Sequence, residues 1–224
     1  RAGRRQVDGR GAQRVVKRLL AASRRHKTRV LFLTNNDATL LLNHWLARTG
    51  NADVRIWRGR LAPAVLRRFN PEWIISYGYR FLIPADILDS RPGRFINLHI
   101  SFLPWNRGAH PNIWSFLDGT PKGVSIHLID AGMDTGGILA QRRLCFDESR
   151  ETLASSYAKL QACLQKLFKQ NWDRIRRERI PPVPQTGKGT AHFLRDCLEI
   201  QEVADRLGWD CPVRTFKAQM RGRA

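Results

Sequence analysis

Short apolar runs alternate with helix-forming segments along the first half of this chain, and this order constrains the fold more than any other feature. Runs typical of buried strands occupy residues 29–34, 53–57, 72–76 and 94–100. The segments between them carry helix caps or an apolar stripe at helical spacing. Strands that alternate with helices build a parallel sheet through right-handed crossovers. We therefore expect an α/β protein whose mostly parallel sheet is flanked by helices.

The second half of the chain predicts a strand pair and one long helix. Residues 124–129 alternate apolar and polar side chains, and residues 137–145 are the expected partner strand. An apolar stripe at spacings of four and three predicts a helix over residues 150–178, which the proline-rich segment 181–184 ends. A further helical signal covers residues 200–207. We expect three parts: a basic N-terminal arm at 1–27, a main domain at 28–180 and a small C-terminal extension at 181–224.

Positive charge is concentrated at the start of the chain. The formal net charge is +20, and residues 1–29 hold eleven basic residues and one acidic residue, Asp8. Clustered Lys and Arg side chains can neutralise phosphates, but no aromatic residue accompanies this arm for base stacking. We interpret the arm as a solvated basic segment, so nucleic acid is not an expected partner.

Hydropathy and cysteine spacing argue against a membrane protein and a metal-binding protein. No apolar run approaches the roughly 20 residues that span a bilayer, so we expect no membrane insertion. The four cysteines, at 145, 163, 197 and 211, form no Cys-x-x-Cys pair and have no His at metal-ligand spacing. We expect reduced thiols in a cytoplasmic protein, and no metal site.

Three side chains suit transfer of an acyl group to an amine. Asn97 and His99 lie two residues apart on an expected strand, so they project from the same face. Asn97 can donate to a developing oxyanion, and an imidazole titrates near neutrality. The glycine-rich loop 131–136 can bring Asp134 to the imidazole, orient it and favour its cationic form. Each residue alone has an ordinary structural explanation, as does His127, which we interpret as structural or supporting.

Residues 94–140 resemble the catalytic core of the 10-formyltetrahydrofolate-dependent formyltransferases. Asn97-Leu-His99, Leu103-Pro104, Arg107-Gly108 and Gly132-Met-Asp-Thr-Gly136 follow that family's pattern in order and spacing, and a weaker resemblance extends over 29–178. The resemblance implies a Rossmann-like sheet, with residues 28–180 as the formyltransferase catalytic domain. It places the family's catalytic trio on Asn97, His99 and Asp134.

The same resemblance implies 10-formyltetrahydrofolate as the formyl donor and no metal. Two loops are similar to those that hold the pterin ring of the donor in the family. The cofactor-binding residues implied are Tyr79, Arg80, Phe81, Leu82 and Ile83 on one side, and Ile129, Asp130, Gly132 and Met133 on the other.

Residues 102–112 and 121–124 look most like the sugar N-formyltransferases. These enzymes formylate a nucleotide-linked amino sugar, such as a dTDP- or GDP-linked 3- or 4-amino-dideoxyhexose, often for surface polysaccharides such as the lipopolysaccharide O-antigen. Arg107 could bind a diphosphate or could pin the loop through backbone carbonyls, and Trp105 and Trp114 could stack on a ring or pack in the core. The expected substrate-binding residues are Trp105, Asn106, Arg107, Gly108, His110 and Asn112.

Other activities stay open at this point. Methionyl-tRNA formyltransferase has a related Arg-Gly-Ala-x-Pro segment but carries a sizeable C-terminal domain, whereas about forty residues follow the proline-rich stop here. Glycinamide ribonucleotide formyltransferase matches in length but usually lacks the 105–112 segment. A formyltransferase-like fold could also serve as a non-catalytic nucleic-acid-binding module that uses the basic arm. The long helix and the tail could form a homodimer face.

Overall fold

A computed structural model describes residues 27–222, and residues 1–26 of the predicted arm lie outside them. Six strands form one sheet in the order β2-β1-β3-β4-β6-β7. The neighbours among β1 (Thr28–Leu33), β2 (Ala52–Trp57), β3 (Trp73–Ser76) and β4 (Phe95–His99) pair in parallel. The strands β6 (Lys122–Leu128) and β7 (Ile138–Leu144) are antiparallel to their neighbours. The expected α/β class with a mostly parallel sheet is confirmed.

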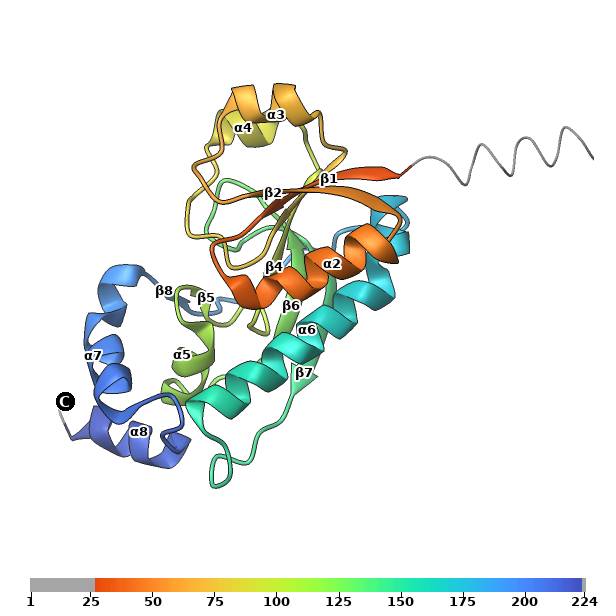
Figure 1. Cartoon of the computed structure of the whole chain (residues 1–224). Helices are drawn as coiled ribbons and strands as arrows, with labels where there is room; N and C mark the ends of the chain where they lie inside the picture. Colours follow the sequence, from red (N-terminus) through yellow and green to blue (C-terminus); the bar gives the residue numbers. More distant parts are fainter. Residues whose placement is uncertain (1–26, 223–224) are drawn as a thin grey trace, which may run out of the picture.

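Helices cover both faces of the sheet (Figure 1). The helices α2 (Leu40–Arg48), which follows the 3-10 turn η1 (Asp37–Thr39), and α6 (Leu153–Arg176) lie on one face, and α3 (Pro63–Phe69) and α4 (Ala85–Asp89) lie on the other. Val30 and Phe32 pack toward α2 and α6, whereas Leu31 and Leu33 pack toward α3 and α4. Burial on both faces explains why this strand is apolar without alternation.

The helix α6 begins with a capping box. The Thr152 side chain accepts from the Ser155 N–H, and the Ser155 hydroxyl accepts from the Thr152 N–H. Its buried stripe matches the predicted spacing and includes Leu160, Leu164 and Leu167. Among residues 27–222, no helix has both the length and the apolar character that crossing a bilayer requires.

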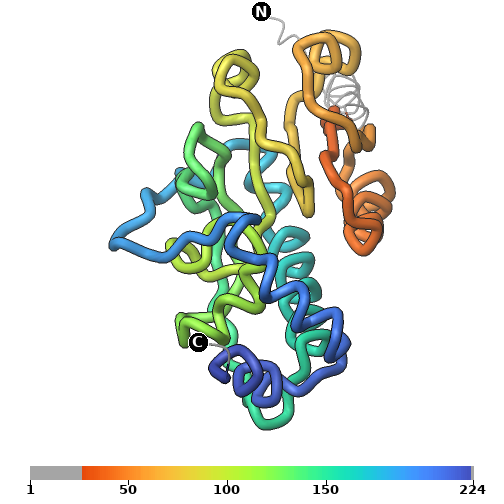
Figure 2. Tube along the Cα trace, turned by 90° about the vertical axis from the view of Figure 1, so that its left-hand side faces the viewer, coloured from red at the N-terminus to blue at the C-terminus, as the bar shows by residue number. Residues whose placement is uncertain are grey.

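The remaining elements gather at one end of the domain. They are β5 (Arg107–Gly108), α5 (Pro111–Leu117), β8 (Ala191–His192), the 3-10 turn η2 (Leu194–Cys197), α7 (Leu198–Leu207) and α8 (Val213–Arg221). Figure 2 shows the chain after α6 returning beside the 105–110 loop, where β8 pairs with β5 in parallel. Beyond it, Ile200, Val203 and Phe216 pack with Ile113 and Phe116 of α5. The division at residue 181 stays a prediction, and this cluster joins both sides of it.

Candidate active site

The side chains of Asn97, His99 and Asp134 meet beside the end of β4. Asn97 and His99 project from the same face of that strand, and Asp134 lies in the loop between β6 and β7 with a φ of 53°. Asn97 Nδ2 donates to Asp134 Oδ1 at 3.0 Å, and His99 Nε2 lies 3.6 Å from Asp134 Oδ2. The structure therefore brings together the three residues that the sequence singled out.

The imidazole of His99 is held from a second direction. Its Nε2 lies 3.1 Å from the carbonyl oxygen of Asn106, and His99 is buried. A carbonyl oxygen only accepts, so Nε2 carries a hydrogen in this arrangement. Among the described residues no partner contacts the other ring nitrogen, Nδ1. The loop after β4 thus fixes both the tautomer and the direction of the ring.

A second imidazole, His127, reaches the same carboxylate. It faces Asn97 across the antiparallel pair of β4 and β6, and its side chain is 1% exposed. His127 Nε2 lies 3.4 Å from Asp134 Oδ1 and 3.3 Å from Asn97 Nδ2, while Nδ1 donates to the Leu128 carbonyl at 2.7 Å. The alternation in β6 places His127 opposite the apolar face. Only the register of β6 against β4 shows that this face belongs to the site.

The surroundings of Asp134 favour its anion. Burial opposes ionisation, but the His99 and His127 rings and the N–H of Gly108 outweigh it and hold the pKa of Asp134 well below its usual range. The Gly108 N–H donates to Asp134 Oδ2 at 2.8 Å. A carboxylate that stays ionised can orient an imidazole and stabilise its cation.

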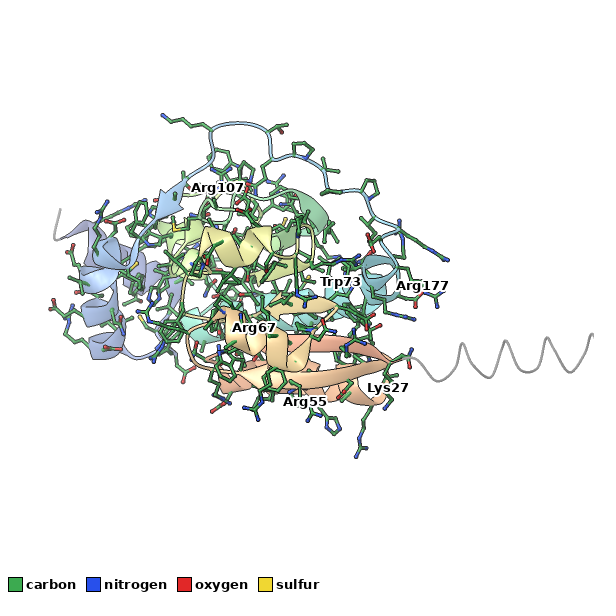
Figure 3. The ribbon with its side chains drawn as sticks, turned by 90° about the horizontal axis from the view of Figure 1, so that it is seen from above. Lys27, Arg55, Arg67, Trp73, Arg107 and Arg177 are labelled. Carbon is green, nitrogen blue, oxygen red and sulfur yellow. The ribbon has the colours of Figure 1, made fainter. Side chains whose placement is uncertain are left out.

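Gln185, in the segment after α6, holds the loop of Asp134 in place through hydrogen bonds. Gln185 Nε2 donates to the carbonyl oxygens of Asp134 at 2.7 Å and Gly136 at 2.9 Å. Gln185 Oε1 accepts from Arg107 Nε at 3.1 Å and from a terminal guanidinium nitrogen of Arg107 at 2.8 Å. Arg107 lies beside this segment in Figure 3. Of its two interpretations, the structure favours loop pinning, through a side-chain amide rather than through backbone carbonyls.

Sequence reasoning missed Gln185, because no local motif surrounds it. Residues that follow Gln185 make further hydrogen bonds to the loop after β4. Thr190 Oγ1 accepts from the N–H of Asn106 at 2.8 Å, and the His192 carbonyl oxygen accepts from the N–H of Ala109 at 2.9 Å. A Cβ on Gly108 would lie 2.3 Å from the His192 carbonyl oxygen. Glycine is therefore required where the two segments touch.

The two loops assigned to the pterin ring border the same side of the sheet. Tyr79, Ile83 and Ile129 all pack against the apolar cluster under α3 and α4. Leu82 is 84% exposed, and among the described residues no partner bonds to the backbone N–H groups of Leu82 and Ile83. Exposed apolar surface beside unpaired backbone groups suits a flat heterocycle with polar edges.

Several residues of these two loops make contacts that stabilise the loops' own conformation. Arg80 donates its N–H to Asn35, and its guanidinium lies 4.8 Å from the centre of the Phe81 ring. Asp130 Oδ1 accepts from the Gly132 N–H at 3.1 Å and from the Thr135 hydroxyl at 2.6 Å. Met133 lies against Gly108, where its sulfur would be 2.7 Å from an added Cβ.

The residues assigned to the substrate differ in accessibility. The Asn106 side chain is fully buried and accepts from Thr120 Oγ1 at 2.6 Å, so it stabilises the loop from within. Trp105 and Gly108 are half-buried, and His110 has a φ of 48° just before α5. Asn112 lies in the first turn of α5 and is 3% exposed.

Three further expectations from the sequence concern a stacking Trp ring, reduced thiols and a metal site. Trp114 stacks on the His192 ring, with centroids 3.8 Å apart, so this ring is occupied by the protein itself. All four cysteines are free thiols. Within residues 27–222, no group of three His, Cys, Asp or Glu side chains could hold a metal ion.

Comparison with known proteins identifies relatives for most of the chain. The family model described as "Formyl transferase" matches residues 51–170. Methionyl-tRNA formyltransferase of Thermodesulfovibrio yellowstonii is 38% identical over 160 residues, which is 70% of this chain and 49% of that protein. The dTDP-4-amino-4,6-dideoxyglucose formyltransferase of Mycobacterium bovis is 38% identical over 130 residues, 58% of this chain and 54% of that protein. The chain spans about half the length of the curated relatives it matches.

A solved structure matches over a larger share. The formyltransferase PseJ of Anoxybacillus kamchatkensis, in complex with UDP-4,6-dideoxy-4-formamido-L-AltNAc and tetrahydrofolate, is 39% identical with a TM-score of 0.75. The match covers 84% of this chain and 97% of that one. With the family model matching more than half of its length and the fold in agreement, the chain belongs to the formyl transferase family.

Proposed function

We propose that this protein transfers a formyl group from 10-formyltetrahydrofolate to the amino group of a nucleotide-linked amino sugar. The observation that carries this proposal is the meeting of Asn97, His99 and Asp134 at the end of β4, with Asp134 held as the anion. Such a site offers a hydrogen-bond donor for a developing oxyanion and an imidazole for the proton. Formyl transfer to an amine needs both.

The substrate amine arrives uncharged, because an ammonium has no lone pair with which to attack the formyl carbon. An amide nitrogen carries two hydrogens, and Asn97 directs one to Asp134. The other lies toward His127 Nε2, 3.3 Å from Asn97 Nδ2, and turns to the formyl oxygen as negative charge develops on that oxygen, which is worth about 10²–10³ in rate.

His99 then moves the proton from the amine toward the leaving nitrogen. Its Nε2 hydrogen points at Asn106 and Asp134, which leaves Nδ1 as the ring nitrogen that exchanges a proton. The Asp134 carboxylate stabilises the imidazolium formed in this step. General acid–base catalysis by a positioned side chain accelerates a reaction roughly 10²–10⁴-fold.

The donor supplies the formyl group, and residues 79–83 and 129–134 are proposed to hold its pterin ring. The exposed Leu82 side chain and the unpaired N–H groups of Leu82 and Ile83, among the described residues, support this assignment. The loop 105–112, with Trp105, Arg107, Gly108, His110 and Asn112, is proposed to border the acceptor.

Similarity to PseJ favours an amino sugar as the acceptor, because that match extends over 97% of a protein crystallised with a formamido sugar on UDP. The methionyl-tRNA formyltransferases of Thermodesulfovibrio yellowstonii and Pelobacter propionicus are 38% and 31% identical to this chain, and each match covers 49% of that protein. Formylation of methionyl-tRNA is therefore the second candidate.

Turnover assays separate the candidates. The full chain is mixed with 10-formyltetrahydrofolate and a panel of UDP-, dTDP- and GDP-linked 3- and 4-amino sugars, or with charged initiator tRNA. We expect formylated amino sugar and unmodified methionyl-tRNA. Formylation of the tRNA alone would select the second candidate, and no formylation of either would remove the proposed activity.

A further inference from the structure

Asn35 joins three loops at the carboxyl edge of the sheet. The strand β1 lies between β2 and β3, and Leu33 at its end is level with Trp57 of β2 and Ser76 of β3. Asn35 is the second residue after β1. A side chain at this position is therefore within reach of the loops that follow both neighbouring strands, at the edge where ligands of open α/β sheets bind.

The Asn35 side chain uses both ends of its amide. Its Oδ1 accepts from the backbone N–H of Arg80 at 3.1 Å, and its Nδ2 donates to the carbonyl oxygen of Arg58 at 2.8 Å. Its backbone N–H donates to the Gly78 carbonyl at 3.0 Å. A carboxylate cannot make both side-chain bonds, because it has no hydrogen to donate to a carbonyl oxygen. The position therefore needs a group that both donates and accepts.

The segment 58–60, which follows β2, supports the loop 79–83 that is proposed to bind the formyl donor. The hydroxyl of Tyr79 donates to the Gly59 carbonyl at 2.7 Å. The guanidinium of Arg60 lies 4.9 Å from the centre of the Phe81 ring. Because Asn35 bonds to the first residue of this segment, it holds the support as well as the loop itself.

The proposed donor loop is fixed at its base and unpaired at its tip. Residues 78–80 all bond to the loops after β1 and β2, whereas the N–H groups of Leu82 and Ile83 have no partner among the described residues. Gly78 has a φ of 64°, and a Cβ there would lie 3.0 Å from the Asn36 Cβ, so the base packs closely. A loop held in its bound conformation loses less entropy when a ligand binds.

We propose that Asn35 is a positioning residue for the formyl donor. It holds the segment 58–60 and the base of the loop 79–83, so that the free N–H groups at the tip meet the pterin ring. The inference rests on the proposed function, and it adds a residue outside the catalytic trio and outside both pterin loops. Its loss should weaken donor binding and leave the chemical step unchanged.

The test removes the Asn35 amide and compares it with a similar amide elsewhere. Asn35→Ala loses the hydrogen bonds to Arg80 and Arg58. Asn171→Ala is the matched control, because Asn171 is also half-buried and its Nδ2 donates to a backbone carbonyl, that of Leu167 at 2.8 Å, within α6.

Calorimetry with tetrahydrofolate measures the Kd in the absence of an acceptor. One hydrogen bond changes an equilibrium constant about 2- to 10-fold, so we expect Asn35→Ala to raise this Kd at least about fivefold. Asn171→Ala should match the wild type. In steady-state formylation the KM for the donor should rise by the same factor, while kcat and the KM for the acceptor stay within about twofold. A general loss of stability would not separate KM from kcat in this way.

Tyr79→Phe tests the same support from the other side. It keeps the ring but removes the hydrogen bond to Gly59, and we expect it to raise the Kd for tetrahydrofolate about 2- to 10-fold. It also decides the matter if Asn35→Ala does not fold. A wild-type Kd in folded Asn35→Ala and Tyr79→Phe proteins would overturn the positioning role while donor binding stands. A wild type that binds no tetrahydrofolate would overturn the donor assigned under the proposed function, and this inference with it.

Discussion

The side-chain amide of Gln185 donates to the backbone carbonyl of Asp134 at 2.7 Å, across 51 residues of sequence. The same amide oxygen accepts from Arg107. Gln185 therefore ties the loop of Asp134 to the loop that follows β4. Because it contacts both loops without touching the side chains of Asn97 or His99, we propose that Gln185 is a positioning residue.

Gln185→Glu separates the two halves of this link. A carboxylate still accepts from Arg107 but cannot donate to the Asp134 and Gly136 carbonyls. We expect kcat to fall between about 10- and 100-fold, because a small displacement of a catalytic group has a large effect on rate. The KM values for donor and acceptor should stay within about twofold.

The surface pair of Arg142 and Gln170 provides the matched control. Arg142 donates to Gln170 Oε1 at 3.1 Å in an exposed setting. Gln170→Glu should leave kcat unchanged. A Gln185→Glu protein with wild-type kcat would show that the link has no part in positioning.

The catalytic roles proposed for Asn97 and His99 predict large effects on the rate without loss of the fold. Asn97→Ala should lower kcat by about 10²–10³, since it removes the oxyanion donor. His99→Asn should lower it by roughly 10²–10⁴. Circular dichroism and thermal unfolding check the fold, and steady-state formylation measures the rate; full activity in either variant would contradict the mechanism.

His127 should contribute through Asp134. His127→Phe keeps a ring in this buried site but removes the contact of Nε2 with Asp134 Oδ1. Hydrogen bonds to charged groups are worth about 1.5–3 kcal/mol, so we expect kcat to fall about 10- to 150-fold. An effect on KM alone would assign His127 to substrate binding instead.

Because the pKa of Asp134 is lowered in the folded protein, part of the free energy of unfolding depends on pH in the acid range. A carboxyl whose pKa is lower in the folded state stabilises the protein above its unfolded pKa of about 3.9, and this contribution is lost as pH falls through the folded value. The difference in unfolding free energy between the wild type and Asp134→Asn should be constant from pH 7 to about pH 5. Urea unfolding should show it shrinking below about pH 4; a constant difference down to pH 2 would contradict the assigned ionisation.

Much of the fold follows from local periodicity. Continuous apolar runs identify β1 and β3, and the stripe at spacings of four and three identifies α6, because these patterns record which faces are buried. Sequence reasoning missed the helix α8, although Val213, Phe216 and Met220 recur along it at spacings of three and four and pack in one cluster. The two-residue strand β8 forms only because β5 lies beside it.

The sequence by itself determined the order of strands in the main sheet and of the helices that cover it, the shared face of Asn97 and His99, and the glycine-rich loop that carries Asp134. These are properties of neighbours in the chain, where side-chain direction follows from backbone geometry. Only the tertiary structure decided that His127 and Gln185 join the site, that Arg107 pins a loop, and that Asn35 joins the loops after β2 and β3. Those contacts join segments as far as 78 residues apart (Arg107 to Gln185), and they exist only once strand register and helix packing have brought the segments together.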